Sequence, residues 1–96
     1  MPAPSTHLTR EQIALRDVRR RAFGAALAQA RLTAGMTQDE LAAASGVSRP
    51  TISRLELGTS SISSDRVWDL AEALGTTPAD IYAVAQREAR ATVNRK

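Results

Sequence analysis

The sequence predicts an all-α protein, a compact bundle of five helices with an N-terminal helical extension. Three kinds of observation predict this class. Residues that cap helices recur along the chain, apolar residues follow each cap at the spacing of one helix face, and glycines stand where the helices should end. The 96 residues are enough for one domain with one small core.

The middle of the chain contains two short helices joined by a sharp turn. Thr37 and Glu40 form a capping box, in which the hydroxyl accepts from the third helical N–H and the carboxylate accepts from the cap. Gly46 ends this first helix, because glycine adopts the left-handed backbone of a helix-ending turn. Ser48 caps the second helix, which ends before Gly58.

The second of these helices should have an inward and an outward face. Ile52 and Leu55 recur at helical spacing and should face the first helix, where the small side chain of Ala42 allows a steep crossing. The opposite face then carries Pro50, Ser53, Arg54 and Leu57, and Arg49 projects from the first turn of the helix. Proline is tolerated in a first helical turn, because its missing N–H breaks no bond there.

This two-helix segment, residues 37–58, resembles the helix-turn-helix of the lambda-repressor-like, Cro-type (Xre) family of bacterial and phage DNA-binding proteins. The shared pattern is Gln38, Leu41, Ala42, Gly46, Val47, Ser48, Ile52, Ser53, Leu55, Glu56 and Gly58. It continues upstream through Phe23, Gly24, Leu27, Arg31 and Gly35, and downstream through Val67, Leu70, Ala71, Leu74 and Gly75. The similarity covers roughly residues 22–83 and implies a DNA-binding domain over residues 22–91. An arbitrary helical hairpin would not need the caps, the turn glycine and the small contact residue together.

The resemblance implies that the helix from Ser48 enters the major groove of double-stranded DNA. Matched to the family, the candidates for base contact are Arg49, Pro50 and Arg54. The candidates for contact with the DNA backbone are Gln38, Ser48, Thr51, Ser53, Arg31 and Arg20. Arg31 also matches the family arginine that pairs with the glutamate ending the recognition helix, here Glu56. Proline cannot donate a hydrogen bond, so that position reads a thymine methyl or shape, whereas arginine prefers guanine.

Both ends of the chain differ from this core. Residues 1–8 are expected to be disordered, residues 9–21 to form a helical extension capped by Thr9, and residues 92–96 to fray. The extension can pack either on its own domain or on a second subunit. The arginine run at residues 19–21 is either a solvated helix face or a contact with DNA phosphates or a neighbouring protein.

The dimer interface can be the N-terminal extension or the last helices. Trp68 lies beside the apolar stripe of the helix that Ser63 or Ser64 caps. It is interpreted either as partly buried under the last helix, which Thr77 caps, or as an exposed aromatic residue in a dimer interface near Tyr82.

Composition excludes several classes of function. The chain has no cysteine, and its one histidine, His7, lies in the N-terminal stub, so a metal site, a cofactor or an enzyme active site is not expected. No apolar run reaches the ~20 residues of a membrane span, and a signal peptide core is lacking, so a cytoplasmic protein is expected. Its 13 basic and 10 acidic residues give a net charge of +3, and all the basic residues except Lys96 are arginine, which suits contact with phosphate and guanine.

Two functions remain. The first is a sequence-specific transcriptional regulator, most simply a repressor acting as a homodimer on a pseudo-palindromic operator. The alternative is an antitoxin-type autorepressor that also binds a partner protein. Both would be bacterial or phage proteins acting on nucleoid DNA in the cytoplasm, as the resemblance implies.

Overall fold

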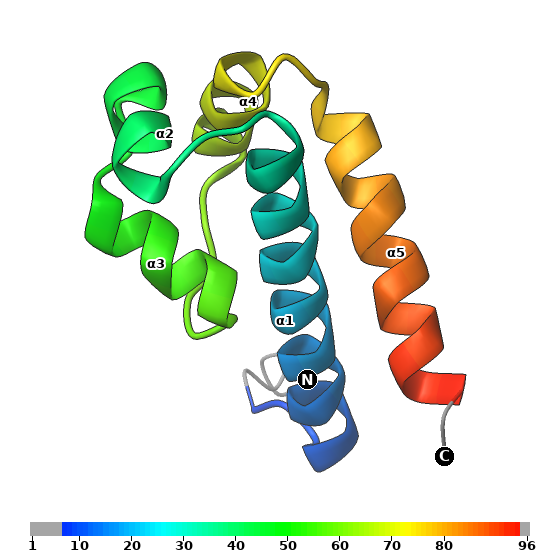
Figure 1. Cartoon of the computed structure of the whole chain (residues 1–96). Helices are drawn as coiled ribbons and strands as arrows, with labels where there is room; N and C mark the ends of the chain where they lie inside the picture. Colours follow the sequence, from blue (N-terminus) through cyan, green and yellow to red (C-terminus); the bar gives the residue numbers. More distant parts are fainter. Residues whose placement is uncertain (1–6, 95–96) are drawn as a thin grey trace.

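A computed structural model describes residues 7–94, which form five α-helices and no strand (Figure 1). The helices are α1 (Arg10–Thr33), α2 (Gln38–Ser45), α3 (Arg49–Leu57), α4 (Ser64–Ala73) and α5 (Pro78–Asn94). The all-α, five-helix prediction is therefore confirmed. The expected N-terminal stub falls largely on residues 1–6, which lie outside the described residues, as do residues 95–96.

The helices begin where the sequence signals predict. At α1 the Thr9 N–H donates to Gln12 Oε1 over 2.8 Å and the Gln12 N–H donates to Thr9 Oγ1 over 3.1 Å. The same reciprocal pair forms between Thr37 and Glu40 at α2, over 2.9 and 3.0 Å. Hydrogen bonds from Thr37 lower the pKa of the Glu40 carboxyl, because they stabilise its charged form. At α4 the cap is Ser63, one of the two serines considered.

Helix α1 lies between the other elements. Figure 1 shows the α2–α3 pair on one side of α1 and α5 running along the other side, with α4 joining the two halves. The contacts agree with this view, since α1 packs on both α3 and α5, and α4 packs on both α2 and α5. The position of α3 is therefore set by α1 as well as by α2.

Two clusters of buried side chains fill the interior. The larger holds the helix-turn-helix together and consists of Leu27, Leu41, Val47, Ile52, Leu55 and Leu70. The smaller lies between α1, α4 and α5 and consists of Ala22, Ala26, Ala71, Ile81 and Ala85. Alanines at this second contact let α1 and α5 approach closely. Ala42, expected at the α2–α3 crossing, is partly buried against the larger cluster.

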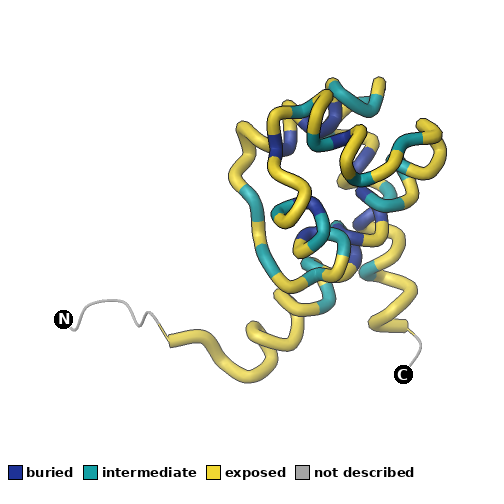
Figure 2. The backbone as a smooth tube through the Cα atoms, turned by 60° about the vertical axis from the view of Figure 1, so that its left-hand side comes forward, coloured by how far each residue is buried: buried dark blue, intermediate teal, exposed yellow. Residues whose placement is uncertain are grey.

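The two long helices extend beyond the core at one end of the molecule. The N-terminal extension is continuous with the rest of α1, and its first turns are exposed throughout (Figure 2). Ile13 and Leu15 on this extension are 50% and 39% exposed. Helix α5 continues to Asn94, so residues 92–94, expected to fray, are helical.

The aromatic residues depart from the sequence expectation. Partial burial of Trp68 under the last helix is wrong, because 66% of this residue is exposed on α4. Tyr82 instead packs against Phe23, with ring centroids 5.4 Å apart and ring planes inclined by 44°. Phe23, expected to face the core, is partly buried between the two clusters.

Candidate nucleic-acid interface

The α2–turn–α3 unit has the backbone geometry that its sequence demands. Gly46 ends α2 with φ of 77°, in the left-handed region that favours glycine. Ser48 caps α3, and its hydroxyl lies 2.8 Å from Thr51 Oγ1 and accepts from the Thr51 N–H over 3.3 Å. Ile52 and Leu55 are buried, so the inward face of α3 is the one predicted.

The C-terminal end of α3 rests directly on the backbone of α1. A Cβ atom placed on Gly24 of α1 would lie 2.2 Å from the Leu55 carbonyl oxygen and 2.7 Å from that of Glu56. A Cβ on Gly58, which follows α3, would similarly lie 2.8 Å from the Arg21 Cα. The absence of side chains at these two glycines therefore lets α3 approach α1 to a distance that no other residue permits.

A charged network fixes the same end of α3. Arg31 on α1 pairs with Glu56 through two contacts, Nε to Oε2 over 2.7 Å and Nη2 to Oε1 over 3.0 Å. The Arg31 Nη1 donates to the Met36 carbonyl over 2.8 Å, and the Gln38 amide donates to Glu56 Oε1 over 3.0 Å. The side chains of Arg31 and Glu56 are only 13% and 9% exposed, so the pair that the resemblance implied is present and well shielded from solvent.

This network ties three helices together. Arg31 comes from α1, Gln38 from the start of α2, and Glu56 from the end of α3. The hydrogen bond to Glu56 raises the pKa of the Arg31 guanidinium above its ordinary value, because it favours the charged form. Bidentate pairs of arginine and carboxylate are geometrically specific, so the network holds α3 at one angle to α1 and α2.

The outward face of α3 is the one predicted from its sequence. Arg49, Pro50, Arg54 and Leu57 are exposed, and Leu57 is 69% exposed. Ser53 on the same face is half-buried. Two arginines and one proline therefore project from a short helix whose opposite face is locked into the core.

Sequence reasoning missed one contact at this face. The Nε atom of Arg49 lies 3.2 Å from Asp39 Oδ1 in the first turn of α2, and the two side chains are 61% and 79% exposed. No local signal predicts this pair, because the residues are ten positions apart on different helices.

The remaining candidates have different surroundings. Gln38 and Arg31 use side-chain donors within the network, and the hydroxyls of Ser48 and Thr51 lie within hydrogen-bond distance of each other. Arg20 is on α1, one turn before Gly24 and on the same helix face. Residues 7–94 contain no cluster of side chains suited to a metal ion and no helix that could span a membrane.

A capped two-helix unit whose second helix is packed into the core and presents arginines has the arrangement of a helix-turn-helix DNA-binding unit. The helix-turn-helix family model matches residues 27–81. The chain therefore belongs to this family, the lambda-repressor-like, Cro-type (Xre) class of DNA-binding transcription regulators.

Two regulators of known structure resemble the chain. The clp gene regulator ClgR from Corynebacterium glutamicum is 36% identical, with a TM-score of 0.77 over 80% of this chain and 82% of that one. A second ClgR structure is 41% identical, with a TM-score of 0.67 over 71% and 88% of the chains. The restriction-modification controller protein C.AhdI from Aeromonas hydrophila is 31% identical, with a TM-score of 0.63 over 65% and 94%. Comparison with curated protein sequences gave no significant match.

Proposed function

We propose that this protein is a transcriptional repressor that binds a pseudo-palindromic operator as a homodimer in the cytoplasm. The observation that carries this proposal is the outward face of α3, where two arginines project from a helix held by the Arg31–Glu56–Gln38 network. The similarity to a clp gene regulator and to a restriction-modification controller protein supports a role in gene regulation.

Base recognition follows from the chemistry of the exposed residues on α3. A guanidinium donates two hydrogen bonds to O6 and N7 of guanine, so Arg49 and Arg54 each read one guanine in the major groove. Pro50 offers only apolar contact, which suits a thymine methyl group. Each half-site therefore contains guanines at two positions, and few side chains carry the specificity.

The DNA backbone is contacted by groups around α3. The free N–H groups at the start of α2, near Gln38, face a phosphate favourably because of the helix dipole. The hydroxyls of Ser48, Thr51 and Ser53 and the guanidinium of Arg20 contribute further contacts. Each of the three side-chain nitrogens of Arg31 donates one hydrogen bond inside the protein, so its contribution to DNA backbone binding is mainly its positive charge.

Replacing Arg54 with alanine tests the recognition helix. This change should leave the melting temperature nearly unchanged, because Arg54 is exposed, and should weaken operator binding by about ten- to a hundredfold. At one base pair per half-site, the variant should no longer discriminate between the operator base and its substitutes. The measurement is the affinity for an operator selected from a random duplex library and for its single-base variants.

The control for Arg54→Ala is Arg87→Ala on α5, which removes the same charge from an exposed residue outside the helix-turn-helix. This variant should bind the operator like the wild type, apart from a small electrostatic change. If Arg54→Ala instead weakened binding to operator and random DNA equally, Arg54 would contact the backbone and the proposed orientation of α3 would be wrong.

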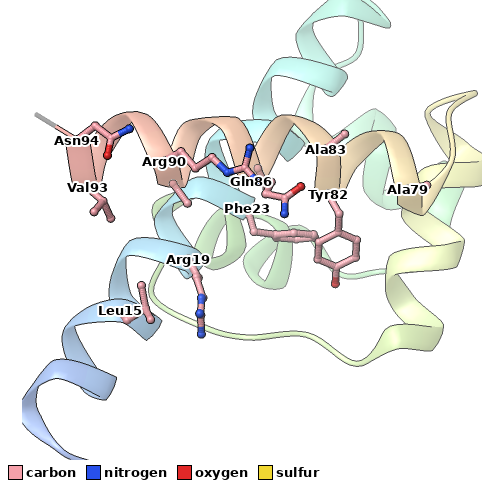
Figure 3. Close-up of a pocket in the computed structure, with 12 residues that line it drawn as sticks. Leu15, Arg19, Phe23, Ala79, Tyr82, Ala83, Gln86, Arg90, Val93 and Asn94 are labelled. Atoms are coloured by element: carbon pink, nitrogen blue, oxygen red, sulfur yellow. The ribbon is translucent and has the colours of Figure 1, made fainter.

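The homodimer is proposed because one recognition helix with two reading arginines supplies little specificity. Paired half-sites with centres about 10 bp apart double the contacts. An apolar groove of about 660 Å³ lies between the N-terminal half of α1 and the side of α5 that faces it (Figure 3). Leu15, Tyr82 and Val93 line this groove, and all three are exposed, with Tyr82 and Val93 each 51% exposed. Exposed apolar side chains gathered on two helices favour this groove as the dimer interface.

Two charge insertions distinguish the candidate interfaces. Val93→Asp places a carboxylate in the groove and should convert the dimer to a monomer at micromolar concentration, with little loss of stability. Trp68→Asp, the matched change at the exposed aromatic residue of α4, should leave the dimer intact. Light scattering with and without DNA checks both results. A dimer that survives Val93→Asp but is lost in Trp68→Asp would place the interface on α4.

The alternative function, an antitoxin-type autorepressor with a partner protein, is favoured by one feature of the same groove. Among residues 7–94, the charged residues that line it are Arg19 and Arg90, and none of the lining residues carries a carboxylate. An acidic partner segment would complement this lining. A small protein that copurifies at fixed stoichiometry, and is lost in Val93→Asp, would support this alternative.

A further inference from the structure

The contact between Asp39 and Arg49 is hard to explain by stability. Ion pairs between two exposed side chains add little to stability, and this pair is 61% and 79% exposed. An acidic residue in the first turn of α2 does favour the helix dipole, but Glu40 already supplies a carboxylate there and closes the capping box. The carboxylate of Asp39 also stands at the face that is proposed to meet DNA, where phosphates repel it.

The geometry of the pair suggests what Asp39 does. The Asp39 Oδ1 atom lies 3.2 Å from Nε, so the carboxylate faces this edge of the Arg49 guanidinium and leaves the two Nη groups available. Those two groups together carry four N–H donors, enough for a bidentate contact with the O6 and N7 atoms of guanine. A guanidinium held by one edge also loses less conformational freedom on binding than a free one.

The Asp39–Arg49 pair lies next to the network that fixes the end of α3. Asp39 and Arg49 border a hollow of about 430 Å³ together with Arg31 and Gln38, two members of the network that fixes the end of α3. Asp39 therefore projects from a helix turn held by the Thr37–Glu40 capping box and the Gln38–Glu56 hydrogen bond. The backbone that carries Asp39 is therefore held in place relative to α3.

We propose that Asp39 is a specificity-determining positioning residue, which aims the Nη groups of Arg49 at one guanine per half-site and opposes the use of Arg49 on phosphates. This inference rests on the proposed function of α3 as the reading helix. On the operator, the oriented guanidinium of Arg49 forms its two hydrogen bonds with guanine. On random DNA, the Arg49 guanidinium can bind only phosphate, and the neighbouring Asp39 carboxylate disfavours that contact.

The two roles give opposite effects on two kinds of DNA. Without the carboxylate, Arg49 is less well aimed, so operator binding weakens. The same change removes a negative charge from the DNA face, so binding to random duplex strengthens. If the Asp39 carboxylate had no positioning role, its removal would strengthen binding to the operator and to random DNA equally.

The experiment compares Asp39→Asn with wild type on the operator, its single-base variants and random duplex DNA. The wild type first selects its operator from a random duplex library. Asp39→Asn should lower the ratio of operator to random affinity about tenfold, which is within the range of one bidentate base contact. Asp39→Asn should reduce the base preference at the position that Arg49 reads. The Arg49→Ala variant identifies this position. The base preference at the position that Arg54 reads should not change.

Three further variants make the result specific. Asp69→Asn on α4 removes a carboxylate from an exposed residue outside the helix-turn-helix and should not change the ratio. In an Arg49→Ala background, Asp39→Asn should cause no further loss of base preference, because its partner is gone. Asp39→Glu keeps the charge and should retain part of the preference. Thermal melting confirms that each variant is folded.

The outcomes separate this inference from the proposed function. Equal strengthening of operator and random binding by Asp39→Asn, or an unchanged base preference, would overturn the role of Asp39 while leaving α3 as the reading helix. A wild type that selects no sequence from the library would instead contradict the proposed function.

Discussion

Replacing Gly24 with alanine is expected to destabilise the protein by about 1 to 3 kcal/mol, as overpacking of a tight contact does. The added methyl group would stand 2.2 Å from the Leu55 carbonyl oxygen and 2.7 Å from that of Glu56. Both obstacles are backbone atoms, so no side chain can rotate away and α3 has to move off α1. The midpoint of urea unfolding measures the loss, and operator affinity should fall with it.

The neighbouring residue provides the control for this prediction. In an open helix the change from glycine to alanine raises stability by about 1 kcal/mol. Ala25 is exposed one position further along α1, and Ala25→Gly should therefore lower stability by about 1 kcal/mol through helix propensity alone. If Gly24→Ala proved as stable as wild type or more so, the close approach of α1 and α3 would be wrong.

The helices themselves were predictable because their boundaries are encoded locally. Thr9 and Gln12, and Thr37 and Glu40, are each three residues apart, so each capping box is visible in a few letters of sequence. The turn at Gly46 and the inward face at Ile52 likewise depend on neighbours in the chain. The outward set on α3 then followed, since fixing one face of a helix fixes the other.

Contacts between distant segments were predictable only where the family resemblance supplied them. Arg31 and Glu56 are 25 positions apart, and their pairing was expected from the family pattern alone. Gly24 is part of the family pattern, but only the structure reveals the carbonyl groups of α3 against it. Spacing along one helix does not encode the distance to another helix.

The surface was the least predictable part. The helical angle of Trp68 places it beside the core stripe, but whether another helix covers it depends on where α5 packs, and 66% of the residue is exposed. The ion pair between Asp39 and Arg49 depends in the same way on the crossing of two helices. The DNA contacts themselves stay predictions, since they depend on a partner as well as on the fold.

Replacing Glu56 with alanine is expected to cost about 3 kcal/mol of stability, because removing one member of a shielded ion pair leaves the other without compensation. Arg31 would keep only its hydrogen bond to the Met36 carbonyl, and the Gln38 amide would lose its acceptor. Below its melting temperature, the variant should also bind the operator more weakly, since α3 is no longer held at one angle. Urea unfolding and operator binding measure the two effects.

Two companions show whether charge or packing causes the loss. Glu56→Gln keeps an oxygen acceptor but removes the negative charge. It should therefore lose less stability than Glu56→Ala but remain less stable than the wild type. Glu72→Gln, the same change at an exposed site on α4, should stay within about 0.5 kcal/mol of wild type. A double-mutant cycle with Arg31→Met should give a coupling of about 1 to 3 kcal/mol, because the two side chains act as one unit. If the stability losses of the two single variants simply added, the ion pair would not hold α3. The packing of α3 on Gly24 would then fix the position of α3.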